Sequence, residues 1–584
     1  MQRNIHMSKT NTKVTDNLRK QIEAAVTSAM ASGKLPQGEL PSYIIEEPAD
    51  RSHGDIATNV AMAGARVFRM APVKAAQIIL DHIDLENSLI EKCEIAGPGF
   101  INFFLSRRYF AEVLHEIERE GKRYGESNYG QGKKVMVEFV SANPTGPMHL
   151  GNARGGALGD CLAAVMQKAG YEAYREFYVN DAGNQIEKFA SSLEARYMQL
   201  FDESFAFPED GYQGEDIKER AQQFFEQFGD KYVNEDSAGR RKALVDFALP
   251  LNIKRMQDDM AKYKINFDNW FMESTLHESG AVKTVVDTLT EKGLTYEKDG
   301  AIWYKNKDVC TEILLKQGKK QDYIDKLELK DDVLIRSNGN PTYFAADIAY
   351  HKNKFDRGFE KLINVWGADH HGHVMRLKGA MDAVGYHGDD LDILLMQLVK
   401  LVRDGQVVTM SKRTGKAIQL RDLLDEVPVD SARFIFNTRE ATTQMDFDLD
   451  LAIQQDSQNP VYYVQYAHAR ICSILRNLES EGVKARFCTE EELCLLGAPE
   501  EVELIHLLSS FDSEIVSAAR DYDPTKITKY VTNVATYFHK FYNACRVKCD
   551  NEALMQARLS LCIATKTVIK NVLDMFSITC PERM

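Results

Sequence analysis

The sequence lacks long hydrophobic runs and is poor in proline. Apolar segments such as residues 394–402 are interrupted by polar residues, here Gln397 and Lys400, so none approaches the ~18 apolar residues that a membrane-spanning helix needs. Residues 1–8 contain no apolar stretch typical of a secretory signal. Fifteen prolines and 36 glycines among 584 residues are too few for a fibrous chain. We therefore expect a globular protein of the cytoplasm that does not bind membranes.

Paired metal-binding cysteines and an excess of positive charge are also missing. None of the ten cysteines forms a Cys-x-x-Cys pair, so we expect core thiols in a reducing compartment, without zinc or disulfides. The net charge is −14, with 72 Lys and Arg against 86 Asp and Glu, which argues against indiscriminate binding of nucleic acid. Residues 520–584 carry more basic than acidic side chains. A partner that docks on a local basic patch is therefore still compatible with the charge.

The apolar residues that are present, 44% of the chain, are enough for several packed cores. Helical periodicity at residues 14–30 and 71–82 and a strand pattern at 100–105 come before a polar, glycine-rich stretch at 121–134. We predict an N-terminal α+β domain over residues 1–125. From about residue 458 the pattern is almost purely helical, which predicts an all-α bundle over residues 456–584.

Strand and helix patterns alternate between these two regions, over residues 126–455. The predicted strands are 134–140, 174–179, 333–336, 362–366 and 394–402, and the predicted helices are 153–169, 344–354, 374–383 and 420–426. Such alternation predicts a doubly wound parallel sheet, a Rossmann-type α/β domain. From about residue 195 to 330 the alternation gives way to charged helices and a short β segment at 295–305, which predicts an insertion.

The sharpest local signal is the run Ala142-Asn-Pro-Thr-Gly-Pro-Met-His-Leu-Gly-Asn152, where a predicted strand gives way to a helix. α/β sheets bind nucleotides at this position, because backbone N–H groups and the helix dipole favour phosphate. His149 and Asn152 add side-chain donors. We predict that this run binds ATP, with contacts from the following residues: Ala142, Pro144, Thr145, Gly146, Pro147, Met148, Leu150 and Gly151.

Two later loops complete the candidate nucleotide site. Lys412, in the polar loop that starts at Met410 and Ser411, would neutralise a departing polyphosphate, although such a loop alone is commonly a solvated surface. The run 367–373 contains three histidines, but neighbouring histidines at a strand end rarely share one metal. Gly367 and Asp369 suit a ribose-binding turn instead, because an acidic residue accepts hydrogen bonds from sugar hydroxyls.

These motifs resemble the signatures of class I aminoacyl-tRNA synthetases. His149-Leu-Gly-Asn152 is similar to the HIGH motif, and Met410-Ser-Lys412 to the KMSKS motif. The runs 138–152, 54–61, 97–102 and 459–470 resemble the arginyl-tRNA synthetase family specifically, and the resemblance extends from about residue 10 to 584. The chain departs from the signatures in two places. Asn152 replaces the second histidine, and Thr409 replaces the first lysine.

The resemblance implies an arginine–tRNA ligase. Such an enzyme uses ATP, with Mg²⁺ on the phosphates, to convert L-arginine to arginyl-adenylate, and then charges the terminal adenosine of tRNA-Arg. It further implies that activation requires tRNA. The catalytic residues it implies are His149, Asn152 and Lys412.

The resemblance also implies an arginine site. An acidic pair and a tyrosine that bind the guanidinium match Glu138, Asp347 and Tyr343. Carboxylates suit a planar fork of donors, and Tyr343 and Asp347 share one face of a predicted helix, although that pair alone would be an ordinary exposed face. Ser141 and Asn143 match positions that hold the amino-acid backbone, and His371 stands where the family has a glutamine.

The helical region 456–584 resembles an anticodon-binding domain. Stacking and phosphate contacts hold unpaired bases, so Tyr537, Tyr542, Arg546 and Lys548 are the candidates for tRNA contact. An aromatic run at helical spacing is more often core, and we expect Phe538 and Phe541 to be buried. The resemblance implies that the N-terminal domain touches the corner of the tRNA. We expect a monomer.

Two other functions would explain part of these motifs. A small-molecule nucleotidyltransferase uses a similar histidine turn, but would leave the two terminal domains unexplained. A non-catalytic tRNA-binding paralogue would not need His149, Tyr343, Asp347 and Lys412 together. Arginine-dependent ATP–pyrophosphate exchange, with and without tRNA, separates the three alternatives.

Overall fold

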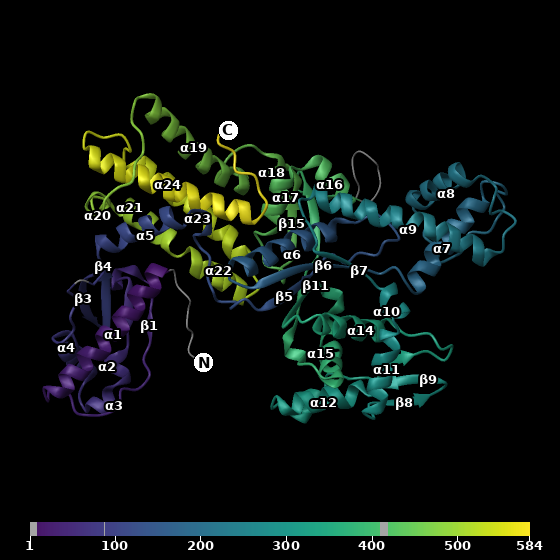
Figure 1. The fold of residues 1–584 in the computed structure, drawn as a ribbon, viewed down its shortest axis with the longest axis horizontal. Helices are drawn as coiled ribbons and strands as arrows, with labels where there is room; N and C mark the ends of the chain where they lie inside the picture. Colours follow the sequence, from purple (N-terminus) through teal and green to yellow (C-terminus); the bar gives the residue numbers. More distant parts are fainter. Residues whose placement is uncertain (1–8, 49, 87, 409–417) are drawn as a thin grey trace.

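The computed structural model describes residues 9–48, 50–86, 88–408 and 418–584. Within these ranges an N-terminal domain, a central domain built on a parallel sheet, and a C-terminal helical bundle follow one another along the chain (Figure 1).

The N-terminal domain is an antiparallel sheet packed against helices, which confirms the predicted α+β class. Its strands have the order β1-β2-β4-β3. Apolar residues recur every three or four positions along α1 (Lys9–Ala31), so that Leu18 and Ile22 are buried in the same core as Phe103 of β4 (Phe100–Leu105). The other elements are β1 (Ile45–Glu46), η1 (Arg51–His53), β2 (Ile56–Thr58), α2 (Val60–Ala63), α3 (Ala65–Phe68), α4 (Pro72–Leu80) and β3 (Ile90–Ala96).

Helix α5 (Arg107–Glu120) and the turn η2 (Gly121–Arg123) leave this domain and pack on the C-terminal bundle. Arg108 forms an ion pair of 2.8 Å with Glu490. The Tyr124 hydroxyl donates a 2.9 Å hydrogen bond to the carbonyl of Leu508. The first and last parts of the chain are therefore in direct contact.

Five parallel strands form the central sheet, in the order β12-β11-β5-β6-β7. Strands lie on both sides of β5 (Lys134–Glu138), as in doubly wound folds. Val135 is buried in one core and Met136 in the other, because successive side chains point to opposite faces of a sheet. The predicted Rossmann-type sheet is confirmed. Its other strands are β6 (Glu172–Val179), β7 (Asn269–Met272), β11 (Lys361–Gly367) and β12 (Leu391–Met396).

Two predicted strands have different partners from those expected. The segment 394–402 is not one strand, because it contains the end of β12 and most of β13 (Val399–Arg403), which belongs to another sheet. The break falls at Gln397, whose N–H donates to Ala441 and so leaves the pairing with β11. Residues 333–336 lie largely in β10 (Asp332–Ile335), which pairs antiparallel with β9 (Ala301–Tyr304). Apolar periodicity identifies a strand but not its partner.

The range 195–330, predicted as one insertion, contains a strand of the parallel sheet. β7 pairs with β6, and its four residues are too few for a recognisable pattern. Before β7, a helical group with its own core around Phe189 and Phe224 extends away from the sheet (Figure 1). After β7, the antiparallel strands β8 (Thr295–Lys298) and β9 confirm the β segment predicted at 295–305. The domain boundaries near 125 and 455 stay a prediction.

The remaining elements of the central domain surround this sheet. They are α6 (Leu150–Lys168), α7 (Asn184–Met198), α8 (Glu215–Phe228), α9 (Ser237–Lys262), α10 (Ser274–Glu278), α11 (Ala281–Glu291), β8 (Thr295–Lys298), α12 (Asn306–Lys316), α13 (Gln321–Asp325), α14 (Tyr343–Asp356), η3 (Ala368–His370), α15 (His371–Val384), η4 (Gly388–Asp390), β14 (Gln406–Val408), α16 (Leu420–Glu426), α17 (Val429–Phe436), β15 (Met445–Asp448) and α18 (Leu449–Ile453).

The C-terminal region consists of helices only, as predicted. They are α19 (Pro460–Ser480), α20 (Glu490–Leu493), α21 (Pro499–Ser509), α22 (Phe511–Arg520), α23 (Thr525–Ala544) and α24 (Glu552–Met575). Across the described part of the chain, no helix has the length and apolar character to cross a membrane.

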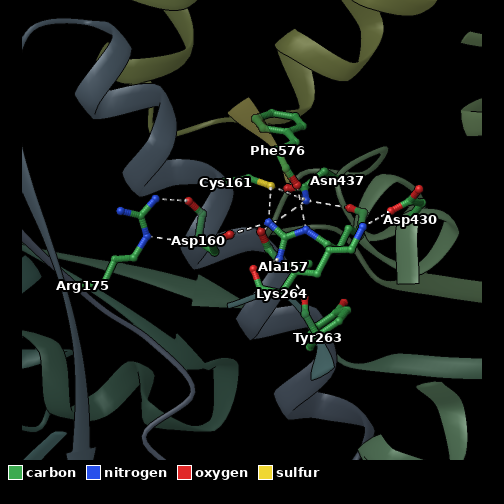
Figure 2. Close-up of polar contacts among 10 residues, drawn as sticks. Ala157, Asp160, Cys161, Arg175, Tyr263, Lys264, Asp430, Asn437 and Phe576 are labelled. Carbon is green, nitrogen blue, oxygen red and sulfur yellow. Dashed lines mark hydrogen bonds and ion pairs between the residues drawn. The ribbon is translucent and has the colours of Figure 1, made fainter. Parts of the chain in front are cut away.

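A fully buried arginine fastens this bundle to the central domain (Figure 2). Arg433 of α17 donates from Nε to the Phe576 carbonyl at the end of α24 (2.7 Å) and from Nη1 to the Tyr263 carbonyl (3.1 Å). Its Nη2 bonds the carboxylate of Asp160 on α6, which also accepts from Arg175 Nε of β6 at 2.7 Å. Helix α6 is thereby tied both to the sheet and to the bundle.

Candidate active site

A cavity of about 1080 Å³ opens at the C-terminal ends of β5, β6 and β11. This edge of a parallel sheet is where α/β domains bind their ligands. The predicted site residues that line it are Glu138, Ser141, Asn143, Tyr343, Asp347, Gly367 and Asp369. Among the residues that the structure describes, no group of three or more His, Cys, Asp or Glu side chains is placed to hold a metal ion.

Helix α6 lies close against the sheet and carries the predicted phosphate-binding turn at its start. A Cβ atom at Gly159 would lie 2.2 Å from Cγ of Phe139, so only glycine permits this approach. Asn252 Nδ2 donates to the carbonyl of Pro144 (2.9 Å), and the Leu420 N–H donates to the carbonyl of Met148 (2.9 Å). The turn 144–148 is thus held in place by α9 and α16.

The predicted ATP-binding residues of this turn are not equally accessible. Pro144, Thr145 and Met148 are buried, so their side chains support the turn. The half-buried members are Ala142, Gly146, Pro147, Leu150 and Gly151. These five residues remain available to a ligand.

His149 caps α6, and its ring proton has a defined position. The Gly151 N–H donates to His149 Nδ1 at 3.1 Å, and the His149 N–H donates to Asn152 Oδ1 at 2.9 Å. Because Nδ1 accepts, the proton of the neutral ring lies on Nε2. Desolvation lowers the pKa of His149. The ring Nε2–H and the Asn152 amide NH₂ are therefore donors at a helix N-terminus.

His149 and Asn152 do not line the 1080 Å³ cavity. The chain reaches them from Asn143, which does, through the turn 144–148. The predicted loop with Met410, Ser411 and Lys412 lies outside the described residues. Beyond that loop, Gln419 pairs antiparallel with His149, so the chain returns from the loop beside the histidine turn.

Glu138 ends β5 with both carboxylate oxygens bonded inside the protein. Oε1 accepts from the Ser141 hydroxyl at 2.8 Å, and Oε2 pairs with Nζ of Lys354, a lysine without exposed surface. Lys354 also donates to Asn364 Oδ1 at 3.1 Å. Val140 (φ 68°) and Ser141 (φ 42°) adopt left-handed backbone angles at the turn that follows, a strained geometry typical of functional sites. Glu138 lines the cavity, but its charge is already balanced.

A different carboxylate, Glu273, lies near Asp347 from the end of β7. It is 3% exposed and accepts a hydrogen bond from the Tyr178 hydroxyl. Burial raises the pKa of Glu273, and the Asp347 carboxylate adds to that increase. Within the described ranges the basic side chains that contact them are histidines and not lysine or arginine: His277 lies 3.2 Å from Glu273 and His373 lies 3.0 Å from Asp347. The two acids therefore form a site in which no lysine or arginine of the described residues pairs directly with either carboxylate.

Tyr343 stands between this acidic site and a neighbouring space. It is 41% exposed and lines both the 1080 Å³ cavity and a second cavity of about 810 Å³, which Glu273 also lines. Tyr343 precedes Asp347 by one helical turn on α14, as predicted.

Sequence analysis missed Glu273, although a signal for it exists. The residue directly follows Trp270-Phe-Met272, a short aromatic segment with β propensity. Interpreting that segment as a strand would have placed Glu273 at the same sheet edge as Glu138. The prediction of a continuous insertion hid it.

The histidine-rich run is also arranged differently from the expectation. His371, predicted to touch arginine, is exposed and does not line the cavity, because it begins α15 on the solvent side. His373 lines the cavity and lies 3.0 Å, through Nε2, from Asp347 Oδ2. Gly367 and Asp369 lie at the end of β11 and line the cavity, where a ribose-binding turn was predicted.

The candidate tRNA residues lie on the C-terminal bundle. Tyr537 and Tyr542 are half-buried, Arg546 and Lys548 are exposed, and Phe538 and Phe541 are buried, as predicted. The guanidinium of Arg470 on α19 lies 4.3 Å from the ring centre of Tyr542 on α23. Tyr466, one helical turn before Arg470, is 40% exposed. The arrangement offers aromatic rings and a cation on one face formed by two helices.

Matches to known protein families cover most of the chain. Residues 16–105 match the family described as arginyl tRNA synthetase N terminal domain, residues 114–472 the catalytic domain of class I tRNA synthetases (R), and residues 464–584 the DALR anticodon binding domain.

Full-length relatives agree with these matches. The chain is 51% identical to an arginine–tRNA ligase of Ruminiclostridium cellulolyticum, over 99% of this chain and 100% of the relative. It is 54% identical to an arginine–tRNA ligase of Caldanaerobacter subterraneus subsp. tengcongensis, over 98% and 99%. The structure of Thermus thermophilus arginyl-tRNA synthetase has the same fold, with a TM-score of 0.70 at 21% identity over 97% of this chain and 100% of that one.

Proposed function

The chain belongs to the class I arginyl-tRNA synthetase family and is an arginine–tRNA ligase, and from this premise we propose how its residues divide the reaction. The arginine carboxylate attacks the α-phosphorus of ATP, which releases pyrophosphate and forms arginyl-adenylate. The 2′-hydroxyl of the terminal adenosine of tRNA-Arg then attacks the arginyl carbonyl carbon, the bond from that carbon to the phosphate oxygen breaks, and AMP departs. Neither step requires much proton transfer by side chains, so catalysis depends on positioning the reactants and on stabilising charge.

The substrate guanidinium is bound by Asp347 and Glu273, with Tyr343 beside them. Two observations support this assignment: the Asp347 carboxylate contributes to the raised pKa of the buried Glu273, and neither acid is paired with a lysine or arginine within the described ranges. Two neighbouring like charges repel until a cation enters, and a planar guanidinium has enough donors to bond both. The resemblance implied that Glu138 binds the guanidinium. In our proposal it instead pairs with Lys354, accepts a hydrogen bond from Ser141 and forms part of the cavity wall.

The amino-acid backbone and ATP occupy the sheet edge between this acidic site and α6. Ser141 and Asn143 hold the amino-acid backbone, and Gly367 and Asp369 hold the ribose. His149 donates from Nε2 and Asn152 from its amide to the phosphates, at the N-terminus of α6. Lys412 neutralises the charge of the leaving pyrophosphate. Mg²⁺ would be bound mainly through phosphate oxygens, because it prefers hard oxygen ligands.

The C-terminal bundle supplies the anticodon surface. Tyr537, Tyr542, Arg546 and Lys548 stay our candidates for tRNA contact, and the Arg470–Tyr542 stack with exposed Tyr466 adds a position for an unpaired base. The monomeric state of the protein and its location in the cytoplasm stay predictions.

The direct test of the arginine site is aminoacylation of tRNA-Arg by the Asp347→Asn and Glu273→Gln variants. We expect kcat/KM for arginine to fall about 100-fold or more in each, because a charge-assisted bond to the guanidinium is lost, while the KM for ATP stays unchanged. Wild-type protein that fails to charge tRNA-Arg, or that exchanges pyrophosphate with another carboxylic acid, would overturn the proposal. Equal losses for arginine and ATP would overturn the guanidinium assignment alone.

A further inference from the structure

Four polar side chains form a continuous chain of contacts along the wall of the 1080 Å³ cavity. Asp347 Oδ2 lies 3.0 Å from His373 Nε2, and His373 Nδ1 lies 2.9 Å from Arg376 Nη2. Arg376 Nη1 is bonded to Asp332. All four residues line the cavity, and they come from α14, α15 and β10.

The donors and acceptors of this chain can be assigned from the chemistry of arginine. A guanidinium has N–H donors and no acceptor, so Arg376 must donate to His373 Nδ1. The imidazole is therefore neutral with its proton on Nε2, and that proton is donated to Asp347 Oδ2. One carboxylate oxygen of Asp347 is engaged in this way, and the second is left for a ligand.

Packing holds the imidazole in this position. The His373 ring lies edge-on to Phe344 with a centroid distance of 5.4 Å and an angle of 76°, and it lies 5.6 Å from the ring of Trp366. The Arg376 guanidinium lies 5.5 Å from the centre of the same Phe344 ring. His373 is 16% exposed as a side chain. A ring held on several sides fixes the direction of the hydrogen bond that it donates.

We infer that His373, oriented by Arg376 and Asp332, is a positioning residue: it holds the Asp347 carboxylate, which binds the substrate guanidinium, in a fixed orientation. A carboxylate whose plane is fixed before the ligand arrives loses less conformational freedom when it bonds a guanidinium. A neutral donor sets that plane without cancelling the negative charge, whereas a lysine would cancel it, as Lys354 does for Glu138. This inference rests on the proposed function of Asp347.

The test measures arginine KM, ATP KM and kcat in aminoacylation for His373→Leu, His373→Gln and Arg376→Leu. Loss of a hydrogen bond to a charged group should raise the arginine KM about tenfold in His373→Leu, with ATP KM unchanged. Arg376→Leu should raise it less, because the imidazole stays in place. His373→Gln should recover most of the loss, since glutamine can place an amide N–H near the position of Nε2. His387→Leu, an exposed histidine just beyond the end of α15, is the matched control.

A double-mutant cycle sharpens the result. In the Asp347→Asn background, His373→Leu should add no further increase in arginine KM, because the two residues act as one unit. The inference is overturned if arginine KM stays at the wild-type value in His373→Leu. It is also overturned if arginine and ATP KM rise together, or if the effects of His373→Leu and Asp347→Asn simply add. Failure of wild-type charging with arginine would instead remove the proposed function itself.

Discussion

The clusters of buried charge around Arg433 and around Asp347 use similar side chains for opposite purposes. In the first, each N–H group of a fully buried guanidinium has a partner from a carboxylate, a backbone carbonyl or a thiol (Figure 2). In the second, two neighbouring carboxylates contact histidines, a tyrosine and an amide, and within the described ranges neither is paired with a lysine or arginine. Matched charge joins parts of the molecule, whereas unmatched charge beside a cavity prepares a binding site.

The Arg433 cluster should show its role through stability. Arg433→Met leaves Asp160 partly unpaired inside the protein, and we expect the free energy of unfolding to fall by about 3–5 kcal/mol. Urea denaturation followed by circular dichroism measures this change. The matched control is Arg520→Met, which removes an exposed pair with Asp521 (2.8 Å) and should cost less than about 1 kcal/mol.

The comparison would fail if Arg433→Met were as stable as wild type, or if the folded variant had a raised arginine KM. In the first case the cluster would not fasten the bundle. In the second case its charge would belong to the substrate site after all.

Lys412 lies outside the described residues, and our proposal gives it a third use of charge, at the leaving pyrophosphate. Lys412→Ala should lower kcat about 100-fold, because this charge is needed when pyrophosphate departs, while the dissociation constant of arginine hardly changes. Single-turnover adenylate formation and calorimetric titration with arginine separate the two quantities. Equal losses in both would show that Lys412 acts in binding rather than in the transition state.

Glu138 lies in the active-site cavity but should behave like the Arg433 cluster. Glu138→Gln leaves Lys354 buried without its carboxylate, so we expect a loss of about 2–3 kcal/mol in the free energy of unfolding. Chemical denaturation at pH 7 measures the change. A variant of wild-type stability that has lost arginine affinity would return Glu138 to the guanidinium site.

Glu273→Gln should raise the free energy of unfolding, whereas Glu138→Gln should lower it. Of the effects predicted here, this one should be the smallest. The pKa of Glu273 is raised in the folded protein by burial and by Asp347, so the folded state binds more protons than the unfolded state above about pH 4.3. The charged form therefore destabilises the fold as the pH rises through the folded pKa. Glu273→Gln should be more stable than wild type at pH 7 to 8 and equal to it near pH 3.5.

Thermal unfolding of both proteins across this pH range tests the sign. A Glu273→Gln variant that is less stable than wild type at neutral pH would show that the charged Glu273 carboxylate has a stabilising partner in the fold, as Glu138 has in Lys354.

Local patterns predicted much of the fold. The helix 420–426 and the strand 100–105 have the predicted bounds, because each has a strong period and clear breakers. β7 was missed because four residues give no period, and 394–402 was interpreted as one strand because the hydrogen bond that ends β12 at Gln397 comes from a distant residue, Ala441.

The sequence by itself determined the order of the domains, the parallel α/β fold and the family, because these depend on periodicity and on contiguous motifs. It also placed Tyr343 and Asp347 one turn apart on a helix. Only the tertiary structure decided which carboxylates are paired with a lysine or arginine inside the protein and which are not. Glu138 pairs with Lys354, 216 residues away, and the strand β7, added to the sheet edge, places Glu273 where the Asp347 charge raises its pKa. A charge's partner depends on three-dimensional proximity, which no local pattern encodes.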